Sequence, residues 1–314
     1  MYRGLKIVAA IPSHQAELTV SGVITTMPAF VDTIVAVDDA SKDRTRQVLL
    51  DCASAHPRLV VLHHDVNQGV GGAMRTAFKH ALTLKCDVVV KMDSDGQMHP
   101  DDLAPLLDAL IDGNYDYAKG NRFLYHRGEL ANMPKVRLLG NLALTFLTKL
   151  ASGYWNIFDP QNGFVACRTR VLERLDLDKM ARDYFFENDM LINLNIVAAR
   201  VVDVPMPARY GDERSSMRIH HIVMRFPIRL FLGYWRRVLE RYVLRDFSPL
   251  VLFLFSGLAM MLFGMGFGGW EWYQSSRTGV EASSGTIMLA ALPFMLGFQL
   301  VLQAIMLDIQ STPR

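Results

Sequence analysis

Cysteine is scarce in this sequence, and its few copies are too scattered to act together. Three cysteines, Cys52, Cys86 and Cys167, occur among 314 residues, and none belongs to a CxxC pair. This spacing excludes a zinc knuckle and a redox dithiol. All three lie in apolar segments, so we expect buried, reduced thiols of the kind found in a cytosolic domain.

An excess of charge and an N-terminal signal are missing as well. Lys and Arg total 33 against 31 Asp and Glu, a formal net charge of +2, which gives no indication of a nucleic-acid partner. The apolar run Leu5–Ile11 ends at Pro12 and is too short for the core of a cleaved signal peptide. We interpret this run as part of the first strand.

Charged residues are absent from two long stretches near the C-terminus, Phe247–Trp270 and Ala282–Leu307. Each stretch exceeds the roughly 20 residues that cross a bilayer core as a helix. Three aromatic residues, Trp270, Trp272 and Tyr273, stand at the start of the expected connecting loop, as in the headgroup zone of a membrane. We therefore predict a transmembrane hairpin (247–314) with spans at about 247–270 and 284–307.

Residues 216–246 are predicted to form amphipathic helices at a membrane interface. Apolar and aromatic residues recur at helical spacing from Ile219 to Tyr242, with arginines between them. Pro227 should divide the segment into two helices, and an ordinary packing helix is the alternative. Because these arginines outnumber Arg277 of the hairpin loop, the positive-inside rule predicts a cytosolic main domain and C-terminus.

Residues 1–215 alternate short apolar runs with helical patterns. This alternation predicts an α/β domain with a mostly parallel sheet and crossover helices. Ligands of such a domain gather at the carboxyl ends of the strands. Strands are predicted at Lys6–Ile11, Thr33–Val37, Leu59–His63, Val88–Met92, Tyr115–Lys119, Gly163–Cys167 and Val201–Pro205, and helices at Asp43–Ala55, Gly71–Leu84, Pro100–Asp112, 133–151 and Phe185–Ala199.

The sequence Asp93-Ser94-Asp95-Gly96-Gln97 directly follows the fourth predicted strand. Two carboxylates two residues apart can share Mg²⁺ or Mn²⁺, whose other ligands are phosphate oxygens and water. The cation would neutralise the diphosphate of a nucleotide-sugar and stabilise it as the leaving group. Acidic loops often contain Asp-x-Asp by chance, but its position at a strand end favours a functional role.

A second acidic sequence, Val37-Asp38-Asp39, ends the second predicted strand and precedes a helix. Ser41 or Asp43 is suited to cap that helix, but capping does not account for Asp38 and Asp39. A carboxylate at a strand end can accept a hydrogen bond from a base N–H. We therefore assign Asp39 to base recognition.

Glycines open the third predicted helix in Asn67-Gln68-Gly69-Val70-Gly71-Gly72. They permit a ligand to approach backbone N–H groups, but a tight turn without a ligand has the same composition. The sequence is neither GxGxxG nor GxxxxGK[ST], which excludes the dinucleotide-binding fingerprint and the P-loop.

Taken in order, Pro12, VDDASKD (37–43), NQGVG (67–71) and DSDGQ (93–97) resemble the family 2 glycosyltransferases, which have a GT-A fold. Four later segments are similar to the branch that contains dolichol-phosphate mannose synthase and bacterial polyprenyl-phosphate glycosyltransferases. They are GNR (120–122), DPQNGF (159–164), YFFEND (184–189) and, after Val204-Pro205, YGDERSS (210–216). A C-terminal two-helix hairpin also occurs in that branch, so the resemblance covers nearly the whole chain.

The resemblance implies a role for each matching residue, in an integral membrane protein of a bacterial inner membrane. Asp93, Asp95 and Gln97 would hold the metal, and Ser94 would join them at the donor diphosphate. Pro12, Val37 and Asp39 would line the base pocket, with His14 as a stacking candidate. Arg122, Arg137 and Asn141 would meet the acceptor phosphate, and Arg209 or Arg214 the donor phosphates, since arginine pairs bidentately with phosphate; a surface salt bridge is the alternative for each arginine.

The chain departs from the family pattern at two places. The family often has Asn-Glu soon after the first proline, whereas Glu17 here lies one place later. Where the family often has Ser-Lys, this chain has Ser215-Ser216-Met217. The role of Glu17 and the identity of the late phosphate-binding cation are therefore left open.

The predicted reaction is an inverting transfer from a nucleotide-sugar, UDP-linked rather than GDP-linked, to polyprenyl phosphate. A phosphate monoester has a second pKa of about 6, so it is largely dianionic and needs no strong general base. Catalysis then depends on positioning and charge neutralisation. We assign Asp95 and Asp159 as catalytic, with Asp159 orienting the nucleophile or the sugar. Glu187 and Asp189 are weaker candidates, because acids also favour the start of a helix.

Other functions fit part of the pattern. A processive synthase of the same fold would carry Q-x-x-R-W and more spans, and another hydroxyl-directed transferase would need a carboxylate base. A sugar nucleotidyltransferase would need a basic, glycine-rich loop after the first strand. A non-enzymatic scaffold would not need Asp39, Asp93, Asp95 and Asp159 together. Small residues of the first span, such as Gly257, permit the close helix contacts of a homo-oligomer.

Overall fold

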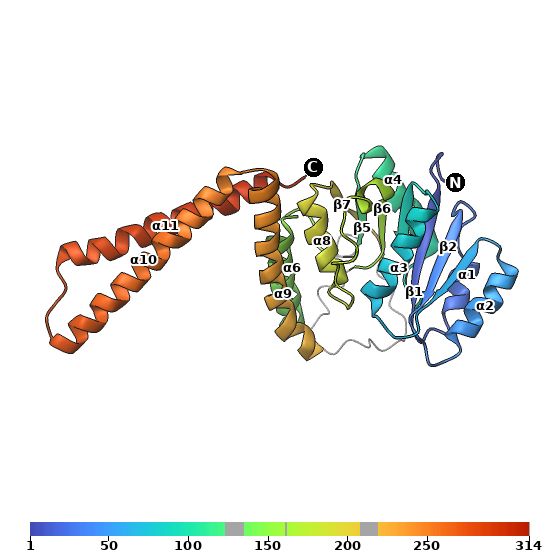
Figure 1. The fold of residues 1–314 in the computed structure, drawn as a ribbon, viewed down its shortest axis with the longest axis horizontal. Helices are drawn as coiled ribbons and strands as arrows, with labels where there is room; N and C mark the ends of the chain where they lie inside the picture. Colours follow the sequence, from blue (N-terminus) through green and yellow to red (C-terminus); the bar gives the residue numbers. More distant parts are fainter. Residues whose placement is uncertain (123–134, 161, 208–218, 314) are drawn as a thin grey trace. The chain divides into compact units, whose positions relative to one another are not determined.

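The structure is a computed structural model that describes residues 1–122, 135–160, 162–207 and 219–313 (Figure 1). Contacts divide the chain into two compact units. The first is Met1–Trp235 with the last two residues, and the second is Arg236–Thr312. The predicted functional boundaries at residues 215 and 246 remain predictions.

The first unit contains a seven-stranded sheet in the order β3-β2-β1-β4-β6-β5-β7. β6 runs antiparallel to β4 and β5, and every other neighbouring pair is parallel. The strand order reverses between β1 and β4, where sheets of this type form a ligand crevice. The predicted mostly parallel α/β fold is confirmed. The strands are β1 (Ile7–Ser13), β2 (Thr33–Asp38), β3 (Leu59–His63), β4 (Val88–Lys91), β5 (Tyr117–Asn121), β6 (Val165–Arg168) and β7 (Val201–Pro205).

Helices cover both faces of the sheet (Figure 1). Side chains of β1 show why: Ile7, Ala9 and Ile11 point into one apolar layer, and Val8 and Ala10 into the other. A strand buried on both faces must be apolar throughout. The first layer holds α1 (Val20–Thr25), α2 (Thr45–Ala55) and α4 (Leu103–Asp112), which follows the 3-10 turn η1 (Pro100–Asp102); the second holds α3 (Val70–Thr83), α7 (Thr169–Leu172) and α8 (Phe186–Ile196).

Two further helices, α6 (Lys135–Ser152) and α9 (Ile219–Leu239), pack against α8. Ile192 of α8 shares a buried cluster with Phe226 and Leu230 of α9 and with the end of α6. Another side of α9 exposes Ile228 and Phe231. An apolar side that the first unit leaves uncovered is what an interfacial helix would present to lipid.

The prediction that Pro227 divides this segment is wrong, because α9 continues through the proline. Proline removes one backbone hydrogen bond and crowds the preceding turn. The packing of Phe226 and Leu230 on α8 holds the helix together across this defect. Helices α1 and α7 were not predicted; with six and four residues, they are too short to show periodicity.

The buried-thiol prediction holds for two of the three cysteines. All three are free; Cys86 and Cys167 are buried, and Cys52 is half-buried. Burial raises the pKa of both buried thiols. These two cysteines therefore act as small apolar core residues.

The second unit is a helical hairpin of α10 (Pro249–Thr278) and α11 (Ser284–Gln310), which run side by side (Figure 1). Both helices are long and apolar enough to cross a membrane. Gly257 and Gly297 let the two backbones touch, since a Cβ on either would lie within 2.7 Å of the carbonyl oxygen of the other. The loop is shorter than predicted: α10 does not end at Trp270 but carries Trp272 and Tyr273 on its last turns.

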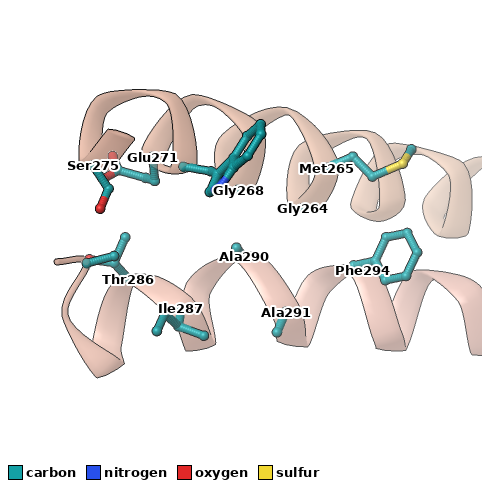
Figure 2. Close-up of a pocket in the computed structure, with 12 residues that line it drawn as sticks. Gly264, Met265, Gly268, Glu271, Ser275, Thr286, Ile287, Ala290, Ala291 and Phe294 are labelled. Atoms are coloured by element: carbon teal, nitrogen blue, oxygen red, sulfur yellow. The ribbon is translucent and has the colours of Figure 1, made fainter. Parts of the chain in front are cut away.

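The two helices separate near their loop around a cavity of about 540 Å³ (Figure 2). Met265 and Phe294 lie at one end, and Glu271, Ser275 and Thr286 at the end nearer the loop. The lining comes wholly from the hairpin and contains none of the predicted site residues. This cavity is therefore not the predicted nucleotide-sugar site.

A buried ion pair, Arg237–Asp308, fastens the chain before the hairpin to the end of α11. Its two hydrogen bonds measure 2.7 Å (Nη1 to Oδ1) and 2.9 Å (Nη2 to Oδ2). The hydroxyl of Tyr242, in the π-helical turn η3 (Glu240–Arg245), donates to Asp308 Oδ1 at 2.7 Å. We call Arg237, Tyr242 and Asp308 the hairpin clasp.

Replacing Asp308 by Asn should destabilise the second unit strongly. The change leaves the Arg237 guanidinium buried without its counter-charge, which costs about 3–5 kcal/mol. Unfolding of the detergent-solubilised protein by heat or denaturant measures the effect. The exposed loop acid Glu281, changed to Gln, is the matched control, and Arg237→Met combined with Asp308→Leu should recover most of the loss. Equal stability of the Asp308→Asn and Glu281→Gln variants would contradict the clasp.

Candidate active site

The carboxyl ends of β1, β2 and β4 bring three predicted motifs to one edge of the sheet. Pro12 pairs with Val37 across β1 and β2, and Ala10 pairs with Lys91, two residues before Asp93. Parallel neighbours end at the same edge, so the predicted base pocket and the acidic pair are adjacent. The side chains of Pro12 and Val37 are buried, and their contact with a base remains a prediction.

The buried Asp39 carboxylate holds the Asn67–Gly71 turn. Its Oδ1 accepts hydrogen bonds from Gln68 N at 2.8 Å and His64 Nδ1 at 2.7 Å, and its Oδ2 accepts from Gly69 N at 2.7 Å. Three of about four lone-pair sites of the carboxylate are thus used within the protein. Asp39 organises the turn, and its predicted role in base recognition is untested.

His14 joins the same cluster. Its Nδ1 donates to the carbonyl oxygen of Asp39 at 3.0 Å, and Asn67 Nδ2 donates to the same oxygen at 3.2 Å. The His14 ring is exposed. Its position beside the Asn67 turn leaves the ring face available for the predicted stacking on a base.

The glycines of the turn allow another part of the backbone, at Ala181 and Arg182, to approach closely. Gly69 has φ +79°, and a Cβ there would lie 2.5 Å from the carbonyl oxygen of Arg182. A Cβ on Gly71 would overlap the carbonyl oxygen of Ala181, and Gly72 N donates to Arg182 O at 3.0 Å. The tight-turn alternative therefore accounts for these glycines.

Two histidines of this cluster were not predicted. His63 Nδ1 lies 2.9 Å from Asp38 Oδ2, and His64 Nδ1 lies 2.7 Å from Asp39 Oδ1. The β2–β3 register pairs Asp38 with His63. The signal was present in the sequence: two adjacent acids end one strand, and two adjacent histidines end the next.

Two acids near the start of α2 have structural partners. Glu17 Oε2 accepts a hydrogen bond from Arg44 N at 2.8 Å, and Asp43 Oδ1 accepts from Thr45 N at 3.1 Å. Both satisfy backbone donors where the helix begins. Asp43 thus satisfies a backbone donor at the start of α2 as the capping alternative requires, although the N-cap position itself is Arg44 and makes no side-chain capping bond; Glu17 contacts the same end of the helix.

The Asp93–Gln97 segment is a tight turn at the end of β4. Asp95 Oδ1 accepts from Gln97 N at 2.9 Å, and Gly96 adopts φ +76°. The carbonyl oxygen of the buried Ser94 accepts from Thr19 Oγ1 at 2.6 Å. The Asp93 side chain is 31% exposed, so this carboxylate can reach a ligand.

The oxygen donors of this turn fit Mg²⁺ or Mn²⁺. The described residues contain no group of three His, Cys, Asp or Glu side chains that could cage an ion. A magnesium ion in a phosphate site needs only one or two carboxylates, because the substrate and water supply the other oxygens. Asp93 and Asp95, with the Gln97 amide, provide such a donor set.

On the acceptor side of the predicted site, Arg122 and Asp159 form a bidentate ion pair. Arg122 Nε donates to Asp159 Oδ2 at 2.8 Å, and Nη2 donates to Oδ1 at 3.1 Å. Gly120 N donates to Phe164 O at 2.9 Å, which brings GNR beside DPQNGF. Asp159 is buried and the Arg122 side chain is 38% exposed, so the carboxylate holds a guanidinium that faces solvent.

The segment that precedes β6 connects these two parts. Because β6 is antiparallel, this segment enters the sheet at the carboxyl ends of β4 and β5. A Cβ on Gly163 would overlap Lys91 Nζ and lie 3.0 Å from Asp93 Oδ2, and Asn162 O accepts from Lys119 Nζ. The described residues of DSDGQ, DPQNGF and GNR therefore lie next to one another at this edge of the sheet.

Four predicted residues have no described side chain. Arg137 and Asn141 belong to α6, but their side chains lie outside the described residues. Arg209 and Arg214 lie outside the described residues altogether. Their predicted contacts with phosphate remain predictions.

The acids of YFFEND stand at the start of α8, and one of them contacts Lys91. Glu187 and Asp189 stand in the first turn of the helix, as predicted. Asp189 Oδ2 accepts from Ala181 N at 2.8 Å. Glu187 forms an ion pair with Lys91, which lies beneath Asp93.

Lys119 is a buried cation that the sequence pattern did not indicate. Burial lowers its pKa to about 8, against the attraction of Asp159, Asp203 and Glu187. Asp203, its partner in the β5–β7 register, is also affected: burial raises the pKa of this carboxyl. Burial therefore disfavours the charged forms of both Lys119 and Asp203 in the interior next to the Arg122–Asp159 pair.

Comparison with known proteins gives a consistent family match. Residues 9–176 match the family described as Glycosyl transferase family 2. The chain is 30% identical over 231 residues, 69% of its length and 91% of the relative, to the UDP-N-acetylglucosamine–dolichyl-phosphate N-acetylglucosaminyltransferase of Methanococcus voltae. It is 32% identical over 174 residues, 55% of its length and 70% of the relative, to the undecaprenyl-phosphate mannosyltransferase of Micrococcus luteus.

A solved structure shares the fold. The glucosyl-3-phosphoglycerate synthase of M. tuberculosis superposes with a TM-score of 0.54 at 20% identity, covering 74% of this chain and 81% of the other. At this level of identity the likeness concerns the fold alone.

Replacing Lys119 by Met should remove a pH-dependent part of the stability. The pKa of Lys119 is about 8 in the folded protein and 10.5 in the unfolded chain. Between these values the unfolded chain binds more protons, so wild-type stability should rise with pH relative to the variant, by about 3 kcal/mol over the whole interval.

Denaturant unfolding of wild type and Lys119→Met at several pH values from 7.5 to about 10 measures this difference. Lys79→Met, which removes a surface lysine paired with Asp178, is the control. Parallel stability curves for wild type and Lys119→Met would contradict the shifted pKa.

Proposed function

Because the chain belongs to glycosyltransferase family 2, we propose that it transfers a sugar from a nucleotide-sugar to polyprenyl phosphate, giving a lipid-linked monosaccharide. One observation carries the proposal: Asp159 pairs with Arg122 of the acceptor side, and Gly163 lies so close to Asp93 of the donor side that a Cβ there would be 3.0 Å from Asp93 Oδ2. A site that joins two anionic phosphates needs this proximity of cation-binding and cationic groups. Relatives that act on dolichyl phosphate and undecaprenyl phosphate support the acceptor class.

On the donor side, Asp93, Asp95 and Gln97 would hold Mg²⁺ or Mn²⁺. When bound, the cation neutralises the departing diphosphate. Pro12, Val37, Asp39 and His14 would surround the base, Ser94 would lie at the diphosphate, and Arg209 or Arg214 would approach the phosphates. We favour a UDP-sugar, in agreement with the name of the relative from Methanococcus voltae.

On the acceptor side, Arg122 would bind the lipid phosphate with Arg137 and Asn141. The phosphate is largely dianionic at neutral pH, so its oxygen attacks the anomeric carbon without a general base. The new C–O bond forms as the bond to the diphosphate oxygen breaks on the opposite face, which inverts the configuration. Asp159 fixes the Arg122 fork, and Asp95 acts on the leaving-group side, so the protein contributes mainly position and charge.

The hairpin and α9 would place this chemistry at a bilayer. We propose residues 1–215 as the cytosolic catalytic domain, 216–246 as the interfacial segment and 247–314 as the membrane anchor of a bacterial inner-membrane protein. The uncovered apolar side of α9 and its arginines suit the headgroup level, where anionic lipid gathers. A polyprenyl tail could then stay in the bilayer while its phosphate reaches Arg122. A homo-oligomer remains a proposal.

A hydroxyl-directed transferase of the same fold is the second candidate. It would require a carboxylate base, and the Asp159 carboxylate already binds a guanidinium at two points. A base engaged in this way is held away from proton transfer. This pairing favours the phosphate acceptor over a sugar hydroxyl.

Purified protein incubated with undecaprenyl phosphate, Mg²⁺ and a panel of UDP- and GDP-sugars should yield a lipid one sugar heavier by mass spectrometry. Omitting the metal, or adding a chelator, should reduce the product at least a hundredfold. The Asp93→Asn variant should do the same, because it removes a ligand charge from the diphosphate site. A polymeric product, or transfer only to sugar hydroxyls, would contradict the proposed acceptor.

Replacing Asp159 by Asn should raise the KM for undecaprenyl phosphate about tenfold and leave the KM for the nucleotide-sugar unchanged. Asn keeps one hydrogen bond to Arg122 but loses the charge-assisted pair, which is worth about 1.5–3 kcal/mol. Steady-state kinetics with each substrate varied separately measures the two KM values. Asp178→Asn, at a surface ion pair, is the control; near-normal turnover and a normal acceptor KM would dismiss Asp159 from the site.

A further inference from the structure

Lys91 places a buried positive charge directly beneath the DSDGQ turn. It is the last residue of β4, and its side chain is 1% exposed. Its Nζ lies 2.7 Å from Asp93 Oδ1 and 3.4 Å from Glu187 Oε1. One ammonium group therefore serves two carboxylates, one from the turn and one from the first turn of α8.

This lysine stays charged although it is buried. Burial alone would lower its pKa, but attraction to Asp93 and Glu187 outweighs burial, and the pKa of Lys91 is raised. Lys119 pairs with the same residue of β6, Val165, yet its pKa is lowered. The difference follows from the partners: Lys119 donates to a carbonyl oxygen, whereas Lys91 contacts two carboxylates.

Gly163 shows that the space is shaped for this ammonium. A Cβ at Gly163 would overlap Lys91 Nζ and approach Asp93 Oδ2 to 3.0 Å. The backbone of the DPQNGF segment thus closes over the ion pair. The ammonium thus stands between two carboxylates, and the Gly163 backbone closes the space beside it.

We propose that Lys91 is a movable counter-ion of the donor site. Its ammonium neutralises Asp93 when no divalent cation is bound, and it shifts to Glu187 when a divalent cation takes the Asp93 carboxylate. The proposal rests on the metal site proposed above. No covalent bond changes, and the positive charge remains paired in both positions.

Glu187 then acts as a positioning residue and not as a metal ligand. A divalent cation at Asp93 must displace Lys91, and a displaced ammonium without a partner would be a buried, uncompensated charge. Glu187 receives it, so binding of the cation does not carry that penalty. The first turn of α8 is thereby coupled to occupation of the donor site.

Binding of Mn²⁺ to the full-length protein in detergent tests this coupling without any turnover. Electron paramagnetic resonance of free Mn²⁺, with and without UDP, gives the dissociation constant for wild type and for the Glu187→Gln, Lys91→Met and Lys91→Met/Glu187→Gln variants. Glu173→Gln, which changes an exposed acid, is the matched control. Melting temperatures identify folded variants, and Lys91→Gln replaces Lys91→Met if the latter does not fold.

The Glu187→Gln change should weaken Mn²⁺ binding about tenfold, the size expected for a hydrogen bond to a charged group. In the Lys91→Met background the same change should weaken it less than twofold, because no ammonium needs a new partner. Lys91→Met alone should bind Mn²⁺ at least as tightly as wild type, having lost the competitor.

Equal weakening by Glu187→Gln in both backgrounds would mean that Glu187 acts on the ion directly, and would overturn the proposal. So would unchanged binding in Glu187→Gln, a measurement that needs no variant of Lys91. Failure of wild type to bind Mn²⁺ with or without UDP would instead remove the metal-dependent function itself.

Discussion

A charge buried in a protein interior must be paired, and this constraint organises the whole candidate site. Four acids or bases at the carboxyl edge of the sheet have partners of opposite or compatible charge. Asp38 and Asp39 contact histidines, Lys91 contacts two carboxylates, and Arg122 contacts Asp159. Apart from the contact between Lys91 and Asp93, which are two residues apart, each pair joins segments that are distant in the sequence. The pairs therefore fix the loops around the site as well as their charges.

In two of these pairs, one charged group is partly exposed to solvent and its partner is buried behind it. Asp93 and Arg122 are partly exposed, whereas Lys91 and Asp159 behind them are buried. The outer groups are of the types that bind a cation and a phosphate. The inner groups hold them in place in a medium of low polarity, where a misplaced charge is costly. Rigid support of this kind is what positioning catalysis requires.

The sequence predicted the mostly parallel α/β sheet and singled out the candidate residues at its edge because both inferences depend on local patterns. Alternating apolar runs indicated a parallel α/β sheet, and DSDGQ, GNR and DPQNGF each carry their signal within a few residues. Lys91, Lys119 and His64 escaped prediction because their roles depend on the register of strands that are distant in sequence. The prediction for Pro227 was wrong because the local tendency of proline to break a helix is outweighed here by packing of α9 on α8.

The hairpin clasp has a consequence for the order in which the protein is made. Arg237 precedes Asp308 by 71 residues, so a ribosome completes the whole of α10 and nearly all of α11 before the acid is available. Until then the guanidinium can only remain in water or among lipid headgroups. Its pairing with Asp308 is thus possible only after α10 and all but the last two residues of α11 have been synthesised. A nascent chain that stalls within the second helix before Asp308 therefore lacks the ion pair that fastens the hairpin.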